Sequence, residues 1–353
     1  MSSSEITRRG FLKAAGVVGA VGMAAPALAR LARTQDKSGK AQIVVGVAPY
    51  LYEMQHDWGT LPADIAWGNT HGVAEDSKGN IYIKHTVHAS STKPDAIVVF
   101  DPDGRFVRSW GGEYKGGAHG LHLSREAGGE FLYICDQARG VVDKTTLIGE
   151  KVWSLTCPME SGLYEKTTEY HPTNVAVVPS GPRAGEFYIG DGYGRSWIHH
   201  YNAKAGYVRS FGGPGNARGQ LKCPHGLMID TRGPEPLLIV ADRGNRRLQV
   251  FTLDGRHVRF VTDELRSPCH FDQREGVLLV PDLEACVTLL DRDNKLIAQL
   301  GDGGGFGLRE KARAEFAPGK FIAPHGAIFD HAGNIFVVEW VEVGRVTKLK
   351  RVS

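Results

Sequence analysis

The chain has 353 residues, of which 42% are apolar, and its 42 Lys and Arg residues nearly balance 39 Asp and Glu residues. The ordinary apolar content and the balanced charge exclude a wholly disordered chain and give no electrostatic footprint for a nucleic-acid partner. The 45 glycines are roughly twice the average share, which indicates many tight turns and short strands rather than long helices.

The first segment has the features of an export signal. Residues 5–16 read EITRRGFLKAAG, with Arg8 and Arg9 adjacent, and a weakly apolar stretch follows from Ala14 to Leu28. Small residues at 27–29 form a cleavage site, and the whole segment resembles a twin-arginine signal. An ordinary secretory signal or a membrane anchor is the alternative, but the paired arginines and the weak hydrophobicity favour the twin-arginine export machinery.

The signal divides the chain into three parts. We predict a signal peptide over residues 1–29, a polar linker over 30–41 and a mature domain over 42–353, located in the periplasm or secreted. No other stretch reaches 18 apolar residues, so no membrane span is expected in the mature chain.

The five cysteines do not have the spacing of a structural disulfide or zinc site. Five cysteines without CxxC spacing predict neither a disulfide framework nor a zinc ribbon. Cys223 and Cys269 each come just before a histidine of interest, which leaves open a bridge between them, a metal contact or two buried thiols. The other three are Cys135, Cys157 and Cys286.

A repeat fills the rest of the chain. Six segments each open with a histidine, continue into a short apolar strand, turn at Gly, Asp or Asn, and enter a second strand, as in THGVAEDSKGNIYI from Thr70. Short strands and turns at such a period are typical of propeller blades. The leading histidines, 45 to 55 residues apart, are His71, His119, His171, His225, His270 and His325.

Six repeats predict an all-β fold, a six-bladed β-propeller. The last repeat ends after three strands, whereas QIVVGV at 42–47 is a strand without a repeat of its own. We expect this N-terminal strand to complete the sixth blade and close the ring, which removes exposed sheet edges. Residues 308–316, between blades five and six, are a weak helix candidate.

The first strand of each propeller blade lines the central channel, so the leading histidines should gather there. Alternate blades lie about 120° apart, which puts His119, His225 and His325 in one threefold set, within the similar frames AHG, PHG and PHG. Three neutral imidazoles around an open fourth position form a catalytic zinc site. The alternative is that these histidines bind only water or carbonyls. A second set lining the channel would be His71, His171 and His270.

The frames AHGL, CPHGL and APHGA, with DGYGR and ADRGNRRLQVF, resemble NHL-repeat propellers, and most of all peptidylglycine α-hydroxyglycine amidating lyase. The resemblance implies one zinc ion on His119, His225 and His325, Tyr193 as the base and Arg243 as the arginine that binds substrate. A nearby cation would lower the pKa of such a tyrosine toward working pH. The alternatives are a packing role for Tyr193 and, for Arg243, a salt bridge to Asp242 or Asp191.

The chain departs from that family at two places. Thr86, flanked by His85 and His88, stands where the family has a second substrate arginine, so the substrate is expected to differ. Gly326 stands where the family has an aspartate that helps to bind a structural calcium, so calcium is not counted among the expected cofactors. Six channel histidines instead of three also suggest a modified site, with a second metal or a histidine base.

An acidic residue ends the second strand in most repeats, and turn anchoring is its simplest role. Two of these residues, Asp282 and Glu339, are also candidates for a carboxylate facing the channel. The full set is Asp136, Asp191, Asp242, Asp282 and Glu339.

Together these features predict an exported metal-dependent lyase that acts on a small hydroxylated or amide-bearing substrate, either a small molecule or a peptide-like compound. Its cofactor is expected to be a divalent metal, with zinc the first choice. Two other functions stay open: a metal-dependent hydrolase such as a lactonase, and a non-catalytic binding propeller.

Overall fold

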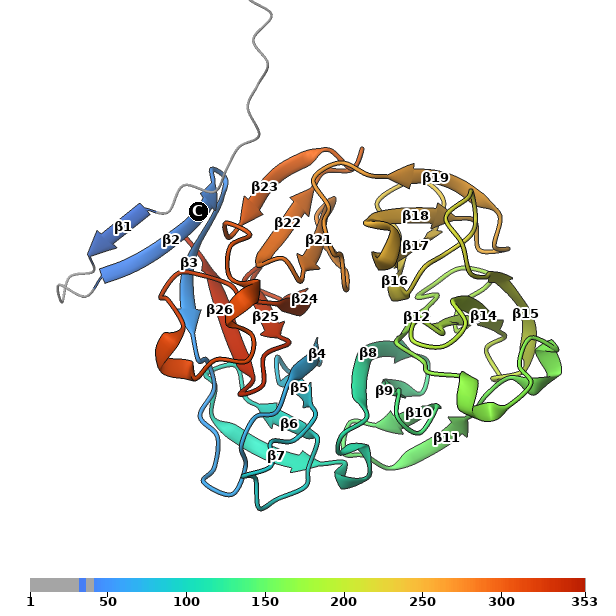
Figure 1. Ribbon diagram of the computed structural model, residues 1–353, viewed down its shortest axis with the longest axis horizontal. Coiled ribbons are helices and arrows are strands. Elements are labelled where there is room, and N and C mark those ends of the chain that lie inside the picture. The colour runs from blue at the N-terminus through green and yellow to red at the C-terminus, as the bar shows by residue number, and fades with distance from the viewer. Residues whose placement is uncertain (1–31, 36–40, 353) are drawn as a thin grey trace, which may run out of the picture.

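Six antiparallel β-sheets lie around a common axis in the computed structural model, which describes residues 32–35 and 41–352 (Figure 1). Five sheets have four strands and the sixth has six. The predicted all-β, six-bladed propeller is confirmed. The expected signal peptide over residues 1–29 lies outside the described residues.

The two inner strands of each blade carry the residues that face the channel and its mouth. The innermost strands are β4 (Thr70–Glu75), β8 (Ala118–Glu126), β12 (Asn174–Val177), β16 (Pro224–Asp230), β20 (Asp272–Arg274) and β24 (Pro324–Phe329). The second strands are β5 (Ile81–His85), β9 (Gly129–Asp136), β13 (Phe187–Gly190), β17 (Leu237–Asp242), β21 (Val277–Asp282) and β25 (Ile335–Glu339).

The two outer strands complete each blade. The third strands are β6 (Ile97–Phe100), β10 (Val141–Thr146), β14 (Trp197–Tyr201), β18 (Arg247–Phe251), β22 (Cys286–Leu290) and β26 (Arg345–Arg351). The outermost strands of blades one to five are β7 (Phe106–Trp110), β11 (Lys151–Leu155), β15 (Tyr207–Gly212), β19 (His257–Val261) and β23 (Leu296–Leu300).

The turn after β6 shows why the strands end where they do. The four residues of β6 are apolar and fully buried. Asp101 then accepts hydrogen bonds from the backbone N–H groups of Asp103 (3.0 Å) and Arg105 (2.9 Å), and Gly104 has a φ of 84°. A side chain that binds its own backbone and a left-handed glycine close a tight turn, so the next strand runs antiparallel to β6.

The N-terminal segment closes the ring, but not with the predicted strand. β3 (Tyr50–His56) pairs antiparallel with β26 and so is the fourth strand of the sixth blade. The predicted segment 42–47 lies in β2 (Ala41–Val47), one strand further out. Two buried side chains of β3, Tyr52 and Met54, pack into the core and fix its register.

Part of the expected linker is also ordered as a strand. β1 (Ala32–Gln35), within the predicted polar linker of residues 30–41, pairs antiparallel with β2 at the outer edge of the sixth sheet (Figure 1).

The hydrophobic core lies between neighbouring blades rather than within one centre. Between blades one and two, Tyr82 and Ile97 pack in one cluster with Leu121, Leu132 and Ile134. Burial of each such side chain contributes roughly 1.5–3 kcal/mol relative to exposure. Every blade is therefore held by both of its neighbours, and the inner strands are fixed in position around the channel.

The weak helix prediction over 308–316 is wrong. This connection between blades five and six contains two single 3₁₀ turns, Phe306–Leu308 and Arg313–Glu315. The other short 3₁₀ turns are Gly112–Tyr114, Met159–Ser161, Thr167–Glu169 and Arg243–Asn245. In the described part of the chain no helix is both long and apolar enough to cross a membrane.

Candidate metal centre

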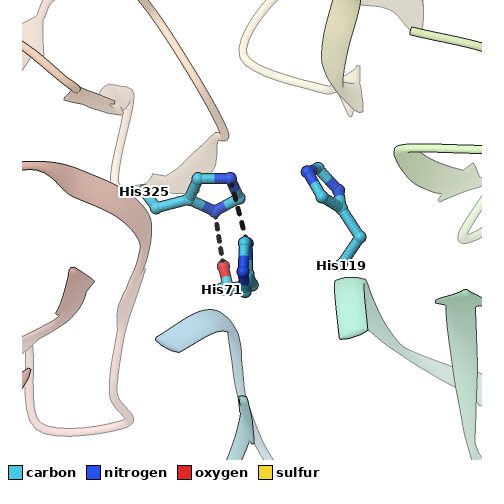
Figure 2. A group of neighbouring side chains, drawn as sticks. All are labelled: His71, His119 and His325. Atoms are coloured by element: carbon cyan, nitrogen blue, oxygen red, sulfur yellow. Dashed lines mark hydrogen bonds between the residues drawn. The ribbon is translucent and has the colours of Figure 1, made fainter. Parts of the chain in front are cut away.

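Four histidines from four different blades meet in the channel. His71, His119, His225 and His325 lie in β4, β8, β16 and β24, and their side chains are at most 7% exposed. Five of their ring pairs have centroids 4.5–5.2 Å apart. Figure 2 shows three of them projecting from separate strands toward one space. The predicted threefold set is therefore brought together, and His71 joins it.

The backbone fixes which nitrogen of each ring faces this space. His119 Nδ1 donates to the carbonyl of Thr173 (2.6 Å), and His225 Nδ1 donates to that of Cys269 (2.8 Å). His325 Nδ1 donates to the carbonyl of His71 (2.9 Å). In a neutral imidazole a protonated Nδ1 leaves Nε2 as a lone pair. The set thus presents three Nε2 lone pairs, each oriented by a main-chain carbonyl as metal-ligating histidines usually are.

The glycine after each of these histidines explains the repeated His-Gly frames. A Cβ at Gly120 would lie 2.4 Å from the Thr173 carbonyl oxygen, and one at Gly226 would lie 2.3 Å from the Cys269 carbonyl oxygen. Any larger residue would push the neighbouring blades apart. Glycine therefore allows the close approach through which Nδ1 reaches its carbonyl.

Burial keeps the rings neutral. It lowers the pKa of His71, His119 and His225 well below the usual value, and the neighbouring histidines or Arg243 lower each of them further. The pKa of His325 falls to about 3, mainly through burial. Since a metal binds the neutral imidazole, these rings need not lose a proton at neutral pH before they act as ligands.

Tyr193 and Arg243 border the cluster. Tyr193 Oη lies 3.1 Å from the Nε2 atoms of both His119 and His225, and Arg243 Nη2 donates to it at 3.3 Å. The tyrosine is 40% exposed, but its hydroxyl is the end that reaches the buried histidines. Burial raises the pKa of Tyr193 to about 12, although Arg243 acts in the opposite direction. The sequence-based expectation of a lowered pKa is not met by Arg243 alone.

The arrangement fits a bound cation. Tyr193 can donate its one proton to only one of the two Nε2 lone pairs that face it, so the other is left against the phenol oxygen without a donor. The ring nitrogens of His71, His119 and His325 also lie within 4.8 Å of one another. Buried lone pairs that face one another without enough protons are stabilised by a positive charge, and imidazole suits zinc, copper, iron or nickel.

The expected second set does not form among the described residues. His71 belongs to the main cluster, whereas His171 Nδ1 donates to the Gln137 carbonyl (2.7 Å) and the His171 carbonyl accepts from Tyr193 N. His270 instead lines a cavity of about 280 Å³ together with His122. In blades three and five, therefore, the repeated histidine of the sequence does not occupy the position that the clustered histidines occupy in the other blades.

Cys269, and not His270, occupies the ring position of blade five. Pro268 forms an antiparallel bridge with Asp282, the last residue of β21. The prolines before His225 and His325 pair in the same way with the last residues of β17 and β25. The residue after the proline therefore faces the channel in all three blades. In blade three the same Pro-X pattern gives Thr173.

The prolines in PHG, PHG, PCH and PTN carry the signal for this register. The repeats were instead aligned on their histidines, which gives the wrong ring residue in blades three and five.

All five cysteines are free, so no bridge joins Cys223 and Cys269. Their thiols instead accept from Arg243, at 3.2 Å (Nη2) and 3.7 Å (Nη1) respectively.

The acidic residues at the ends of the second strands are anchors. Asp242 accepts from the backbone N–H of Lys222, two positions before Pro224, and Asp282 accepts from that of Ser267. Glu339 accepts from the backbone N–H of Ile322. These carboxylates hold the loops that lead into the ring residues and do not serve as channel ligands.

The suggested salt bridge of Arg243 to Asp242 or Asp191 is not present among the described residues. Asp242 pairs with Arg247 (2.7 Å), while Asp191 accepts from Tyr164 and from backbone N–H groups. Arg243 therefore donates its hydrogen bonds to the two thiols and to Tyr193.

His85, which flanks Thr86, is buried and accepts from the backbone N–H groups of Gly68 and Val87.

Comparison with known proteins supports the export signal. A family model for the twin-arginine translocation (TAT) pathway signal sequence matches residues 5–28. The chain thus carries a signal for twin-arginine export to the periplasm or beyond.

The repeats also have relatives of known type. Human NHL repeat-containing protein 3 is 27% identical over 258 residues, which cover 66% of this chain and 67% of that protein. The mouse protein of the same name is 29% identical over 233 residues, 61% of this chain and 62% of its own length. This chain is an NHL-repeat six-bladed β-propeller.

More distant similarities of the NHL propeller are to an amidating monooxygenase and to lyases of known structure. Rat peptidylglycine alpha-amidating monooxygenase is 27% identical over 214 residues, 54% of the propeller chain, but the match spans only 21% of the monooxygenase. Staphylococcus aureus virginiamycin B lyase superposes with a TM-score of 0.55 at 14% identity, over 85% of this chain and all of that one. A streptogramin B lyase structure gives 0.56 at 11% identity, over 84% and 97%. At these identities the structural matches show the fold alone.

Proposed function

We propose that the NHL propeller is an exported metal-dependent lyase whose metal is held by His119, His225 and His325. The observation that carries the proposal is the common orientation of these rings. Each ring donates Nδ1–H to a carbonyl of the next odd-numbered blade and turns its Nε2 lone pair to the channel. A propeller that only bound a partner through its rim would have no use for such a buried, oriented set.

The reaction class follows from the groups around the rings. A divalent metal at this position supplies a Lewis acid that stabilises negative charge on a substrate oxygen, and its charge lowers the pKa of a nearby phenol. Tyr193 Oη, in contact with two of the rings, is placed to take a proton from a substrate hydroxyl. Arg243 donates to the same oxygen and stabilises the phenolate, or binds a substrate carboxylate with its planar fork.

The substrate class is a small hydroxylated or amide-bearing compound. When a carbinolamide loses its hydroxyl proton, the C–O bond becomes a carbonyl as the C–N bond breaks, and the amide nitrogen takes up a proton. No oxidant is needed. The similarity to peptidylglycine alpha-amidating monooxygenase supports a reaction of this kind, and virginiamycin B lyase is a lyase with the same fold.

The proposal is tested by the release of carbonyl product from α-hydroxyglycine derivatives and other carbinolamides, with the metal-loaded protein against a chelator-treated sample. We expect turnover only with metal, restored when zinc is added back. His270→Ala serves as a control, because His270 belongs to no group of donors within metal-binding distance in the described part of the chain and instead lines a cavity with His122. A protein that holds no metal and keeps its binding partners after His119, His225 and His325 are replaced by alanine would be a binding propeller instead.

A further inference from the structure

The ring of channel-facing residues contains one thiol besides its four imidazoles. Taken in blade order, the six ring positions hold His71, His119, Thr173, His225, Cys269 and His325. The thiol of Cys269 is fully buried, and its Sγ lies within 4.8 Å of a ring nitrogen of His225 and of one of His325. No other cysteine belongs to such a donor group in the described part of the chain.

We propose that Cys269 binds the metal as a thiolate, next to the histidines. This inference rests on the proposed metal centre and extends it from an all-imidazole set to a mixed nitrogen and sulfur set. It names a ligand that the histidine repeat does not predict.

Two contacts place Cys269 beside the metal space. Its carbonyl accepts from His225 Nδ1 (2.8 Å), so the same residue that orients one imidazole also brings its own side chain to that ring. Its backbone N–H donates to the carbonyl of Pro281 (2.9 Å), which ties the residue to β21. The thiol is therefore held in position before any metal binds.

A metal is needed to ionise this thiol. Burial raises the pKa of Cys269 to about 12, although Arg243, whose Nη1 donates to Sγ, acts in the opposite direction. On binding, the S–H proton leaves to solvent and the sulfur lone pair forms the bond to the metal, with no change of oxidation state. Thiolate favours zinc, cobalt or copper(I) over magnesium or manganese. Zinc can expand to five ligands, so a fourth protein donor does not close the centre to a substrate oxygen.

X-ray absorption of the zinc-loaded protein tests the ligand directly. We expect one sulfur scatterer at about 2.3 Å beside nitrogen scatterers at about 2.0–2.1 Å. With cobalt(II) in place of zinc, a thiolate-to-cobalt charge-transfer band should appear in the near ultraviolet. Both signals should be lost in Cys269→Ser and kept in Cys223→Ser, a matched control because Cys223 also contacts Arg243 but belongs to no donor group. Metal affinity of Cys269→Ser should fall by more than the roughly 10–100-fold that outer-shell partners cost.

The wild-type spectrum is decisive even if Cys269→Ser does not fold. A metal shell of nitrogen and oxygen alone overturns the thiolate ligand and leaves the histidine centre and the proposed function in place. A sulfur signal that survives in Cys269→Ser and disappears in Cys223→Ser assigns the ligand to the other cysteine and also refutes the inference. Failure of the wild-type protein to bind zinc or cobalt at all removes the metal centre itself, and the proposed function with it.

Discussion

Replacement of Tyr193 by phenylalanine removes one oxygen atom from the centre of the site. That oxygen contacts the Nε2 atoms of His119 and His225 and accepts from Arg243, so this one atom touches three of the proposed groups. With its pKa at about 12, the phenol is ionised at pH 7 in only about one molecule in 10⁵. The tyrosine can therefore act as a base only when additional positive charge is bound beside it.

The expected loss of rate in Tyr193→Phe follows from this role. Loss of a general base typically slows the chemical step by about 10²–10⁴-fold, which corresponds to roughly 3–5.5 kcal/mol in the activation free energy. Removal of the metal should cost at least as much with Tyr193 intact. The imidazoles keep their carbonyl partners in Tyr193→Phe, so metal content and thermal stability should change little.

The assay is single-turnover kinetics on a carbinolamide, with α-hydroxyglycine derivatives tried first, together with metal analysis of the same samples. Tyr170→Phe is the matched control, because the hydroxyl of Tyr170 is buried without a hydrogen-bond partner among the described residues. Full turnover in Tyr193→Phe would refute the assignment and make Tyr193 a packing residue, as would equal losses in the two variants.

Three shorter predictions concern the metal, the export route and a buried charge. His225→Ala should lower metal occupancy sharply and His270→Ala should not; equal losses would mean that the cavity histidine is also a ligand. Arg8→Lys with Arg9→Lys should leave precursor in the cytoplasm, and normal export on cell fractionation would contradict the twin-arginine route. Burial lowers the pKa of Lys84 to about 8, so the unfolded state binds more protons between pH 8 and about 10. Denaturant titrations should therefore show wild type gaining stability relative to Lys84→Met as pH rises over that range, and a constant difference would refute this.

The sequence predicts the blade count well because each blade repeats the same local chemistry. Tight turns such as that at Asp101 and buried β-branched runs such as β6 recur at a steady period, and both are set by short-range interactions. The three ring histidines were also predictable, since the glycine after each is required by the close approach of the next odd-numbered blade.

The predictions of the closing strand and of the ring residues in blades three and five were wrong, because both depend on how the blades pack together. The ring closure went to β3, whose mixed sequence YLYEMQH carries a weaker strand pattern than the segment 42–47. The residues that face the channel in blades three and five are Thr173 and Cys269, because the pairing register of the first strand places them there. His171 lies two residues from Thr173 and His270 lies one residue from Cys269, so a small difference in register places both histidines outside the ring.

Elemental analysis of the mature exported protein tests the metal centre most directly. The protein should carry one divalent metal ion per chain after purification without added metal, with zinc the first candidate, and should lose it when His119, His225 and His325 are replaced by alanine. A wild-type protein that contains no stoichiometric metal and takes up none from excess zinc or cobalt would contradict the account.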